Sequence, residues 1–288
     1  MALKRRRKKS SITNNTVTFD GTFPTELSTP AGNIRDYVTL IYGPPGVGKT
    51  SLASRFGRTM HFMFGDRDVS LRIHKKQIES WPQFEHMVDV WPGQEGFDTA
   101  VVDVTEEAYE MCFSFMCDGI IKDTYGTPVP HPQDAEDRGK SWKLIKRRFV
   151  QPIQKLIACD RGLVLISHAK HSTRSTLEGE ELEDVHPAMS GQALEAMVGL
   201  SDVVGYYSVG RGEARTLQIQ PTYGVLAKCR PHENFRHADG SRVDKIPMGS
   251  SPEEAYANLT KAFDNQLPPP ERTERRKTKL KRTKKTTN

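Results

Sequence analysis

Short apolar runs alternate with longer helical patterns through the middle of the chain. Strand-like runs of apolar and β-branched residues occupy positions 37–42, 59–65, 88–91, 99–104 and 162–167. Between the last two, residues 105–121 and 141–160 carry apolar side chains at helical spacing, the second run being interrupted by Pro152. Strands that alternate with helices predict an α/β fold, with a mostly parallel sheet and helices on both faces.

The pattern changes beyond residue 200. Three strand-like runs follow one another within 201–228 with only turns between them, which predicts antiparallel strands added at one edge of the sheet. We expect a last helix to begin after Ser251, an N-cap serine followed by Pro252 in the first turn and by Glu254 at the capping-box position. This helix should end at about Asn265.

Polar segments flank the predicted core. Residues 10–35 are rich in Ser, Thr, Asn and Pro and contain one short strand candidate at 16–19. We therefore expect an N-terminal arm over 1–35, a single domain over 36–266 and a disordered basic tail over 267–288.

The net charge of +6 conceals a strong asymmetry. Residues 1–9 carry six cations and no acid, and residues 271–288 carry nine Lys or Arg against two Glu, so the segment between them is net acidic. Such blocks of like charge do not pack, and their natural partner is a polyanion such as a nucleic acid. The alternative is that these charged ends serve solubility or, in a eukaryotic source, targeting. Which of the two ends binds a nucleic acid stays open.

The lengths of the apolar runs and the spacing of the cysteines indicate the cellular compartment. The apolar runs are too short to span a bilayer, and none follows the basic start as a secretory signal requires. The four cysteines form no C-x-x-C pair and have no zinc-ligand spacing. We expect reduced thiols in the cytoplasm and no membrane partner.

A phosphate-binding motif follows the first core strand. The stretch "IYGPPGVGKTSL" fits G-x-x-x-x-G-K-[ST], between an expected strand and the helical run at 50–58. Its glycines let backbone N–H groups point at phosphate oxygens, Lys49 would bind the β and γ phosphates, and Thr50 would ligate Mg²⁺. The motif predicts ATP or GTP binding by Gly43, Pro44, Pro45, Gly46, Val47, Gly48, Lys49, Thr50 and Ser51.

The second metal contact should be an acid at the end of a nearby apolar strand. Asp103, in "DTAVVDV", fits that position, and a strand-end aspartate that starts the next helix is the alternative. In the AAA+ pattern the catalytic glutamate directly follows this aspartate, whereas Val104 stands here. The base for hydrolysis must therefore come from elsewhere.

An ordered set of segments resembles a known family. The segments are "GPPGVGKTS", "FMFGD", "AVVDV", "LVLISHAKH", "GLSDVVGYY" and "AKCRP", and they run from about Tyr37 to Pro231. Together they resemble the RecA-fold ATPases, and within that fold the phage-encoded Sak-type single-strand annealing proteins. The resemblance implies a RecA-like P-loop NTPase core that uses ATP and Mg²⁺. In a phage-encoded protein the compartment would be the host cytoplasm.

The resemblance assigns roles at two further strand ends. A RecA-like enzyme carries its water-activating glutamate after the second core strand, and the matching residue in "FMFGDRD" is Asp66, with Asp68 as a second candidate. An aspartate that caps a turn is the alternative for each. The γ-phosphate sensor would be Ser167 or His168, and a histidine that only satisfies local hydrogen bonds is the alternative.

Two segments are candidates for DNA contact. By resemblance, the long polar segment after His168 is a mobile DNA loop in which Lys170, His171 and Arg174 would contact phosphates, although its half at 178–184 is acidic. The second candidate is a helix face that bears Lys140, Lys143, Arg147 and Trp142, and a merely solvated face is the alternative.

Two cations end the matched region. Strand alternation places Lys228 and Arg230 on one face, with Cys229 opposite. Edge residues that discourage aggregation, or DNA contacts, are the alternatives. In RecA-like assemblies a pair at this strand end reaches the γ-phosphate bound by the neighbouring subunit, so the resemblance implies a trans-acting pair and a homo-oligomer, either a ring or a filament.

These features favour an ATPase that acts on single-stranded DNA in recombination or annealing, with a single-stranded-DNA-binding protein as a candidate partner. A protein that binds ATP without hydrolysing it and serves as an annealing or scaffold protein is the first alternative. The second alternative is a P-loop kinase, in which residues 122–148 would imitate a lid.

Overall fold

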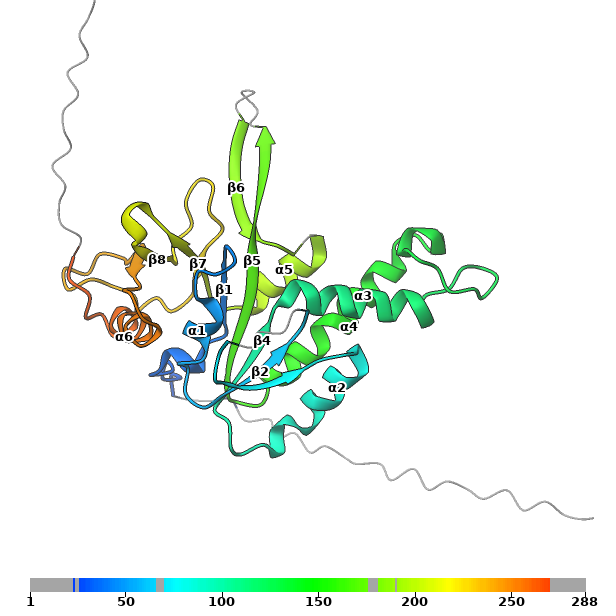
Figure 1. The fold of residues 1–288 in the computed structure, drawn as a ribbon, viewed down its shortest axis with the longest axis horizontal. Helices are drawn as coiled ribbons and strands as arrows, with labels where there is room; N and C mark the ends of the chain where they lie inside the picture. Colours follow the sequence, from blue (N-terminus) through cyan, green and yellow to red (C-terminus); the bar gives the residue numbers. More distant parts are fainter. Residues whose placement is uncertain (1–22, 24–25, 66–69, 176–180, 190, 270–288) are drawn as a thin grey trace, which may run out of the picture. The chain divides into compact units, whose positions relative to one another are not determined.

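The computed structural model describes residues 23, 26–65, 70–175, 181–189 and 191–269 (Figure 1). The chain divides after Pro30 into two units, and the helices and strands described belong to the second unit. Both basic ends lie outside the described residues, as do the strand candidate at 16–19 and both Asp66 and Asp68.

The described elements are ten strands and six α-helices, together with four short 3-10 helices. The strands are β1 (Thr39–Gly43), β2 (Thr59–Met63), β3 (His74–Gln77), β4 (Thr99–Asp103), β5 (Gly162–Ser175), β6 (Glu181–Pro187), β7 (Val203–Val209), β8 (Arg215–Gln218), β9 (Lys228–Cys229) and β10 (Lys245–Pro247). The α-helices are α1 (Lys49–Ala53), α2 (Trp81–Val90), α3 (Thr105–Gly119), α4 (Lys140–Ile157), α5 (Gly191–Leu200) and α6 (Pro252–Phe263).

All of these strands join one sheet, in the order β10-β8-β7-β1-β5-β4-β2-β3, with β6 paired to β5 and β9 paired to β7. The six strands from β7 to β3 run parallel. The pairings of β8, β9 and β10 at the other edge are antiparallel. Both the parallel centre and the antiparallel addition at one edge are thus confirmed.

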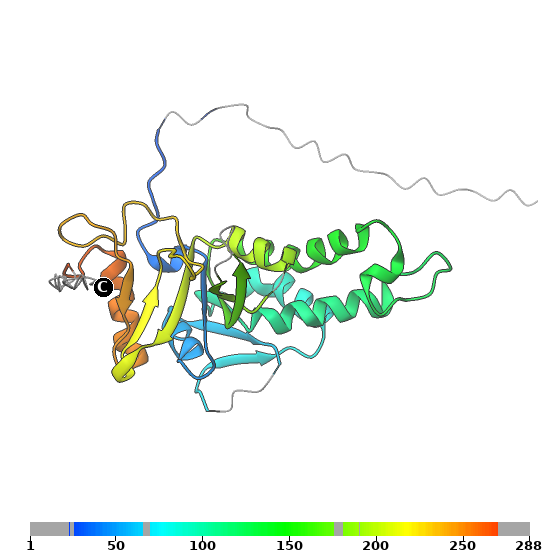
Figure 2. The same ribbon diagram turned by 90° about the horizontal axis from the view of Figure 1, so that it is seen from above.

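Alternate residues of the central strands face two separate cores. In β1, Leu40 and Tyr42 contribute to one core and Ile41 to the other, and all three are fully buried. The first core packs against α2, α3, α4 and α5, and the second packs against α1 and α6. Figure 2 shows α6 on one side of the strands and α3 and α4 on the other. Helices therefore cover both faces, which explains the near-continuous apolar strands.

The last helix and its cap are confirmed. The Ser251 hydroxyl accepts a hydrogen bond from the Glu254 N–H (3.1 Å), and α6 begins at Pro252. The helix ends at Phe263, two residues before the expected end. Among the described residues no helix is long and apolar enough to cross a membrane.

Two expectations about secondary structure are wrong. Residues 88–91 are not a strand, because α2 continues through Val90 and a 3-10 helix follows, so that Val88 and Trp91 are core residues of a helical segment. Pro152 does not interrupt α4, which continues to Ile157 with the proline ring buried in the core. Burial of an amphipathic face thus outweighs the one backbone hydrogen bond that proline removes.

The long polar segment after His168 also differs from the expected loop. Strand β5 continues beyond the sheet and pairs antiparallel with β6, from Ala169 opposite Pro187 to Ser175 opposite Glu181. The resulting hairpin projects past the ends of the neighbouring strands (Figure 1). Apart from Ala169 and Val185, which pack against the first core, it is mostly polar, so it lacks the sustained alternation of apolar and polar residues that marks a strand in a sequence.

Candidate functional site

The phosphate-binding motif lies at the carboxyl edge of the parallel sheet, directly after β1. Gly46 and Gly48 have positive φ values, 75° and 103°, which glycine adopts without a steric cost. A Cβ atom added at Gly43 would lie 2.1 Å from the carbonyl oxygen of Tyr207, so only glycine fits there. The backbone turns sharply between β1 and α1, at the edge where parallel α/β sheets bind their ligands.

Lys49 is the first residue of α1, and it is 6% exposed. Its Nζ donates to the carbonyl oxygens of Gly43 (2.9 Å) and Pro44 (3.0 Å). Burial lowers the pKa of this ammonium, and the carboxylates of Asp103 and Glu106 oppose that shift. A buried cation therefore lies against the loop that would surround the phosphates.

Thr50 and Asp103 meet although they are far apart in the sequence. Thr50 Oγ1 donates to Asp103 Oδ2 over 2.7 Å. Asp103 ends β4 and is 4% exposed; burial raises its pKa, against the hydrogen bond from Thr50 and the charge of Lys49. The contact brings together the two residues that the sequence assigns to a metal ion.

His168 lies beside the phosphate loop. It is the β5 residue opposite Gly43 in the parallel pairing of β1 with β5. Ser167, one residue before it, is buried, and its hydroxyl accepts from the Ala188 N–H (3.1 Å) at the base of the hairpin. The two sensor candidates therefore differ: His168 borders the site, and Ser167 anchors the hairpin.

Glu106 is a site residue that belongs to none of the sequence motifs described above. The carboxylate belongs to the first turn of α3, and its Oε1 accepts from the His168 N–H (2.9 Å) and lies 2.6 Å from His168 Nδ1. Its Oε2 is buried and has no hydrogen-bond partner among the described residues. Glu106 stands three residues after Asp103, so the acidic first turn after "AVVDV" is the signal that could have identified it.

The residues present fit a nucleotide with Mg²⁺. The loop has the backbone conformation that a phosphate cradle needs, Lys49 supplies a cation, and the Thr50 and Asp103 oxygens are the type of ligand that Mg²⁺ prefers. The unpartnered oxygen of Glu106 leaves one acceptor free beside these groups.

The hairpin candidates for DNA contact have different surroundings. His171 Nδ1 lies 2.7 Å from Glu183 Oε1 across the hairpin, so a carboxylate already accompanies this ring. Lys170 is exposed, and the side chain of Arg174 lies outside the described part of the structure. The hairpin is therefore polar on its described faces without being uniformly basic.

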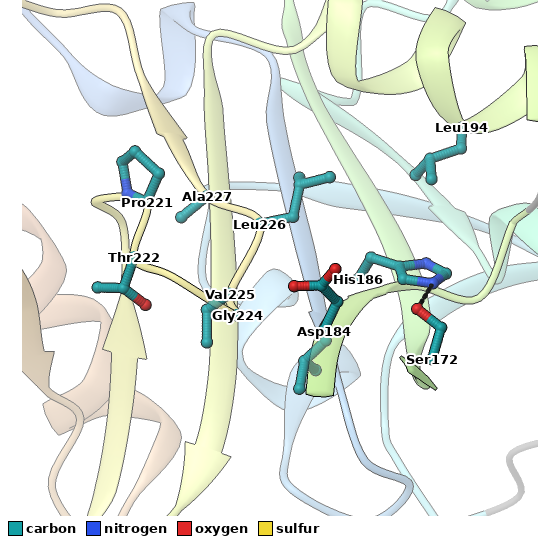
Figure 3. A pocket seen from close by; sticks show the side chains of 11 residues that line it. Ser172, Asp184, His186, Leu194, Pro221, Thr222, Gly224, Val225, Leu226 and Ala227 are labelled. Carbon is teal, nitrogen blue, oxygen red and sulfur yellow. Dashed lines mark hydrogen bonds between the residues drawn. The ribbon is translucent and has the colours of Figure 1, made fainter. Parts of the chain in front are cut away.

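A cleft of about 400 Å³ lies at the base of the hairpin (Figure 3). Strand β6, the segment 221–227 and Leu194 of α5 border it, and His186 Nε2 lies 3.2 Å from the Ser172 hydroxyl. The buried Tyr42 hydroxyl donates to Leu226 O (2.7 Å) and lies 3.1 Å from Val185 O. The strand that precedes the phosphate loop is thereby joined to the hairpin.

Lys228 and Arg230 point at the end of α5. Lys228 Nζ donates to the carbonyl oxygens of Val198 (2.6 Å), Gly199 (3.3 Å) and Ser201 (2.7 Å). Arg230 donates to Asp202 Oδ1 (3.0 Å) and to Gly199 O (2.9 Å). Two cations at a helix C-terminus are favourable for the helix dipole, so the pair has a role within the chain.

The position of this pair excludes a contribution to the phosphate loop of its own chain. Strand β9 pairs with the start of β7, Cys229 lying opposite Val203, and Val203 lies opposite Thr39 at the start of β1. The phosphate loop begins at the other end of β1, about 13 Å away along the strand. The trans-acting role therefore stays a prediction about an assembly.

The helix face expected to bind DNA is only partly formed as predicted. Lys140, Lys143 and Arg147 are exposed on α4. Trp142 instead packs against Phe113 and His131, with ring centroids 6.0 and 5.3 Å away. Residues 122–148, the expected lid of a kinase, include the first half of α4, and α4 packs against α2, α3 and α5.

Comparison with known proteins identifies the core. Residues 35–231, more than half of the chain, match the family model described as AAA domain. The match contains the phosphate loop, Asp103, Glu106 and His168, and it ends next to Arg230. No curated protein matches the chain.

Proposed function

Since the chain belongs to the AAA domain family of P-loop NTPases, we propose that it hydrolyses ATP with Mg²⁺ and acts on single-stranded DNA in recombination or annealing. The observation that carries the nucleotide part is the 2.7 Å contact between Thr50 and Asp103 beside the buried Lys49. The start of α1 and the end of β4 thus converge where phosphates and a metal ion would bind.

Different groups would bind the phosphates and the magnesium ion. Backbone N–H groups from Gly46 to Thr50 would bind the phosphate oxygens, since Pro44 and Pro45 have no N–H to donate, and Lys49 would exchange its two loop carbonyls for the β and γ phosphates. Thr50 and Asp103 would hold Mg²⁺, which neutralises phosphate charge during phosphoryl transfer.

A carboxylate must orient the attacking water. Asp66 is the residue that matches the RecA-like pattern, and Glu106 is the candidate among the described residues. The free Oε2 of Glu106 supports this second candidate, because a base needs an acceptor that is not already used. His168 holds the other oxygen and would register whether the γ-phosphate is present.

Completion of the site between subunits is the third part of the proposal. Lys228 and Arg230 lie at the sheet edge away from their own phosphate loop, so a role in hydrolysis requires a second copy of the chain. Cations that approach the γ-phosphate are a principal device for stabilising charge in phosphoryl transfer. The pair would have to give up its contacts at the end of α5 to reach that position.

Action on DNA is supported by composition and by the resemblance to Sak-type annealing proteins. The two ends of the chain carry fifteen Lys or Arg within 1–9 and 271–288, and such clusters bind phosphate backbones without a choice of sequence. The hairpin begins one residue after His168, which supports the proposal that it responds to the presence of the γ-phosphate.

The test is the ATPase rate with and without single-stranded DNA, with a measurement of molecular size in the same buffers. We expect hydrolysis that DNA stimulates and an assembly that requires ATP. ATP binding without hydrolysis would favour the annealing or scaffold alternative. Phosphate transfer to a small molecule in place of water would instead identify a kinase.

A further inference from the structure

Helices α4 and α5 border a second cleft, of about 520 Å³, away from the phosphate loop. Val150 of α4 also lines it. The polar side chains along its walls are Lys143, Lys146, Arg147 and Gln154 of α4 and Gln192 and Glu195 of α5. Three cations thus face one carboxylate.

The two sides of α4 differ in how their cations are neutralised. The helix contains six Lys or Arg and no acid. Toward α2, Arg148 pairs with Glu85 (2.6 Å) and Lys155 pairs with Asp89. On the side of the cleft, none of the three cations forms an ion pair with a described residue.

The spacing of the unpaired cations makes their arrangement unfavourable for the isolated chain. Lys143 precedes Lys146 by three positions and Arg147 by four, and residues at these spacings are neighbours on a helix surface. Like charges at such spacings repel one another and destabilise a helix. An anion placed between them would remove this repulsion.

We propose that the cleft between α4 and α5 binds the phosphate backbone of single-stranded DNA, an inference that rests on the proposed action on DNA. Charge complementarity selects a polyanion, and the amide groups of Gln154 and Gln192 offer additional donors to phosphate or sugar oxygens. None of the described residues that line the cleft is aromatic, and Trp142 packs instead against Phe113 and His131. Binding there should therefore depend on phosphates and little on the bases.

The experiment measures the salt dependence of DNA binding by the full chain. The probe is fluorescein-labelled oligothymidylate, and anisotropy gives the affinity at several salt concentrations with ATP and Mg²⁺ present. Each phosphate contact contributes about 0.7 to the slope of log affinity against log salt for single strands. The triple variant Lys143→Gln, Lys146→Gln, Arg147→Gln should therefore lose about 2 from that slope.

Lys155→Gln is the matched control, because it removes one cation from the same helix on the side that Asp89 already neutralises. It should leave the slope unchanged, whereas each single change in the cleft should lower the slope by about 0.7. ATPase activity without DNA should stay at the wild-type level in all of these variants, which shows that they fold.

The outcomes separate this inference from the proposed function. A wild-type chain that fails to bind the oligonucleotide at low salt overturns both. Wild-type binding with an unaltered slope in the triple variant overturns the cleft alone. If the triple variant loses affinity for polyaspartate but keeps its affinity for the oligonucleotide, the occupant is an acidic protein and the inference is also wrong.

Discussion

Charged groups lie at both ends of the parallel strands, called here the carboxyl edge and the amino edge of the sheet, and they are bonded in different ways. At the carboxyl edge, Lys49 and Asp103 are almost fully buried, and Glu106 keeps one oxygen without a partner among the described residues. At the amino edge, Lys228 and Arg230 each make at least two hydrogen bonds to the end of α5 or to Asp202. Charges at the first edge retain bonding capacity, and charges at the second edge are satisfied.

This difference separates a ligand site from a structural contact. Burial shifts the pKa of Lys49 downward and that of Asp103 upward, so each charged form is disfavoured where it stands. An arrangement of this kind is retained where a ligand supplies the missing partners. Burial also lowers the pKa of Lys228, so the hydrogen bonds make the difference: helix carbonyls and one aspartate already accept from the cations at the amino edge, which therefore needs no ligand.

The largest predicted effect tests whether the cations at the amino edge are purely structural. If Arg230 acts on the nucleotide of a neighbouring subunit, Arg230→Ala should keep ATP binding and lose about 1,000-fold in ATPase rate, as removal of an arginine finger does. Steady-state hydrolysis and fluorescent nucleotide binding measure the two properties.

A mixing experiment distinguishes action between subunits from simple loss of structure. Subunits with Arg230→Ala and subunits with Lys49→Ala are each inactive, but together they should recover part of the activity. Normal hydrolysis by Arg230→Ala alone would return the pair to a purely structural role at the end of α5.

The next prediction tests whether Lys49 at the carboxyl edge serves hydrolysis and not stability. Lys49→Ala should lower ATP hydrolysis by about 100- to 1,000-fold, because the cation directed at developing phosphate charge is removed. Its melting temperature should stay within about 4 °C of the wild type, since the side chain bonds only two loop carbonyls. Differential scanning fluorimetry and an ATPase assay check this, and strand annealing that survives the substitution would favour the alternative without hydrolysis.

Glu106→Gln tests the unpartnered oxygen. The amide keeps the shape of the side chain and one acceptor for His168, but it cannot take a proton from water. We expect hydrolysis to fall by about 100-fold while ATP binding is retained. Asp66→Asn is the paired variant: if that change alone abolishes turnover and Glu106→Gln has the wild-type rate, the base lies after β2.

The phosphate loop and the alternation of strands with helices could be predicted because each depends on local sequence. Glycines with positive φ, a lysine and a threonine must follow a buried strand, and all of them stand within 43–50. Asp103 was predictable for the same reason, as the last residue of an apolar strand.

The rest depends on contacts between distant segments. Nothing near Lys228 in the sequence indicates that the end of α5 lies within reach of its ammonium. The hairpin of β5 and β6 has no sustained apolar alternation, because only Ala169 and Val185 near its base pack against a core. Glu106 reads as an ordinary acidic residue in the first turn of a helix until the pairing of β1 with β5 brings His168 beside the loop.

The smallest predicted effect concerns Tyr42, which joins the carboxyl edge to the hairpin. Tyr42→Phe removes a buried hydroxyl that bonds Leu226 O and lies near Val185 O, so the free energy of unfolding should fall by about 1 kcal/mol. Val185 O keeps a second donor in the Leu226 N–H, which limits the loss. If the bond also transmits the state of the nucleotide to the hairpin, ATP should change hydrogen exchange in β6 of the wild type and change it less in Tyr42→Phe. Equal changes in both proteins would restrict Tyr42 to packing and leave Glu106 and His168 as the connection between the two regions.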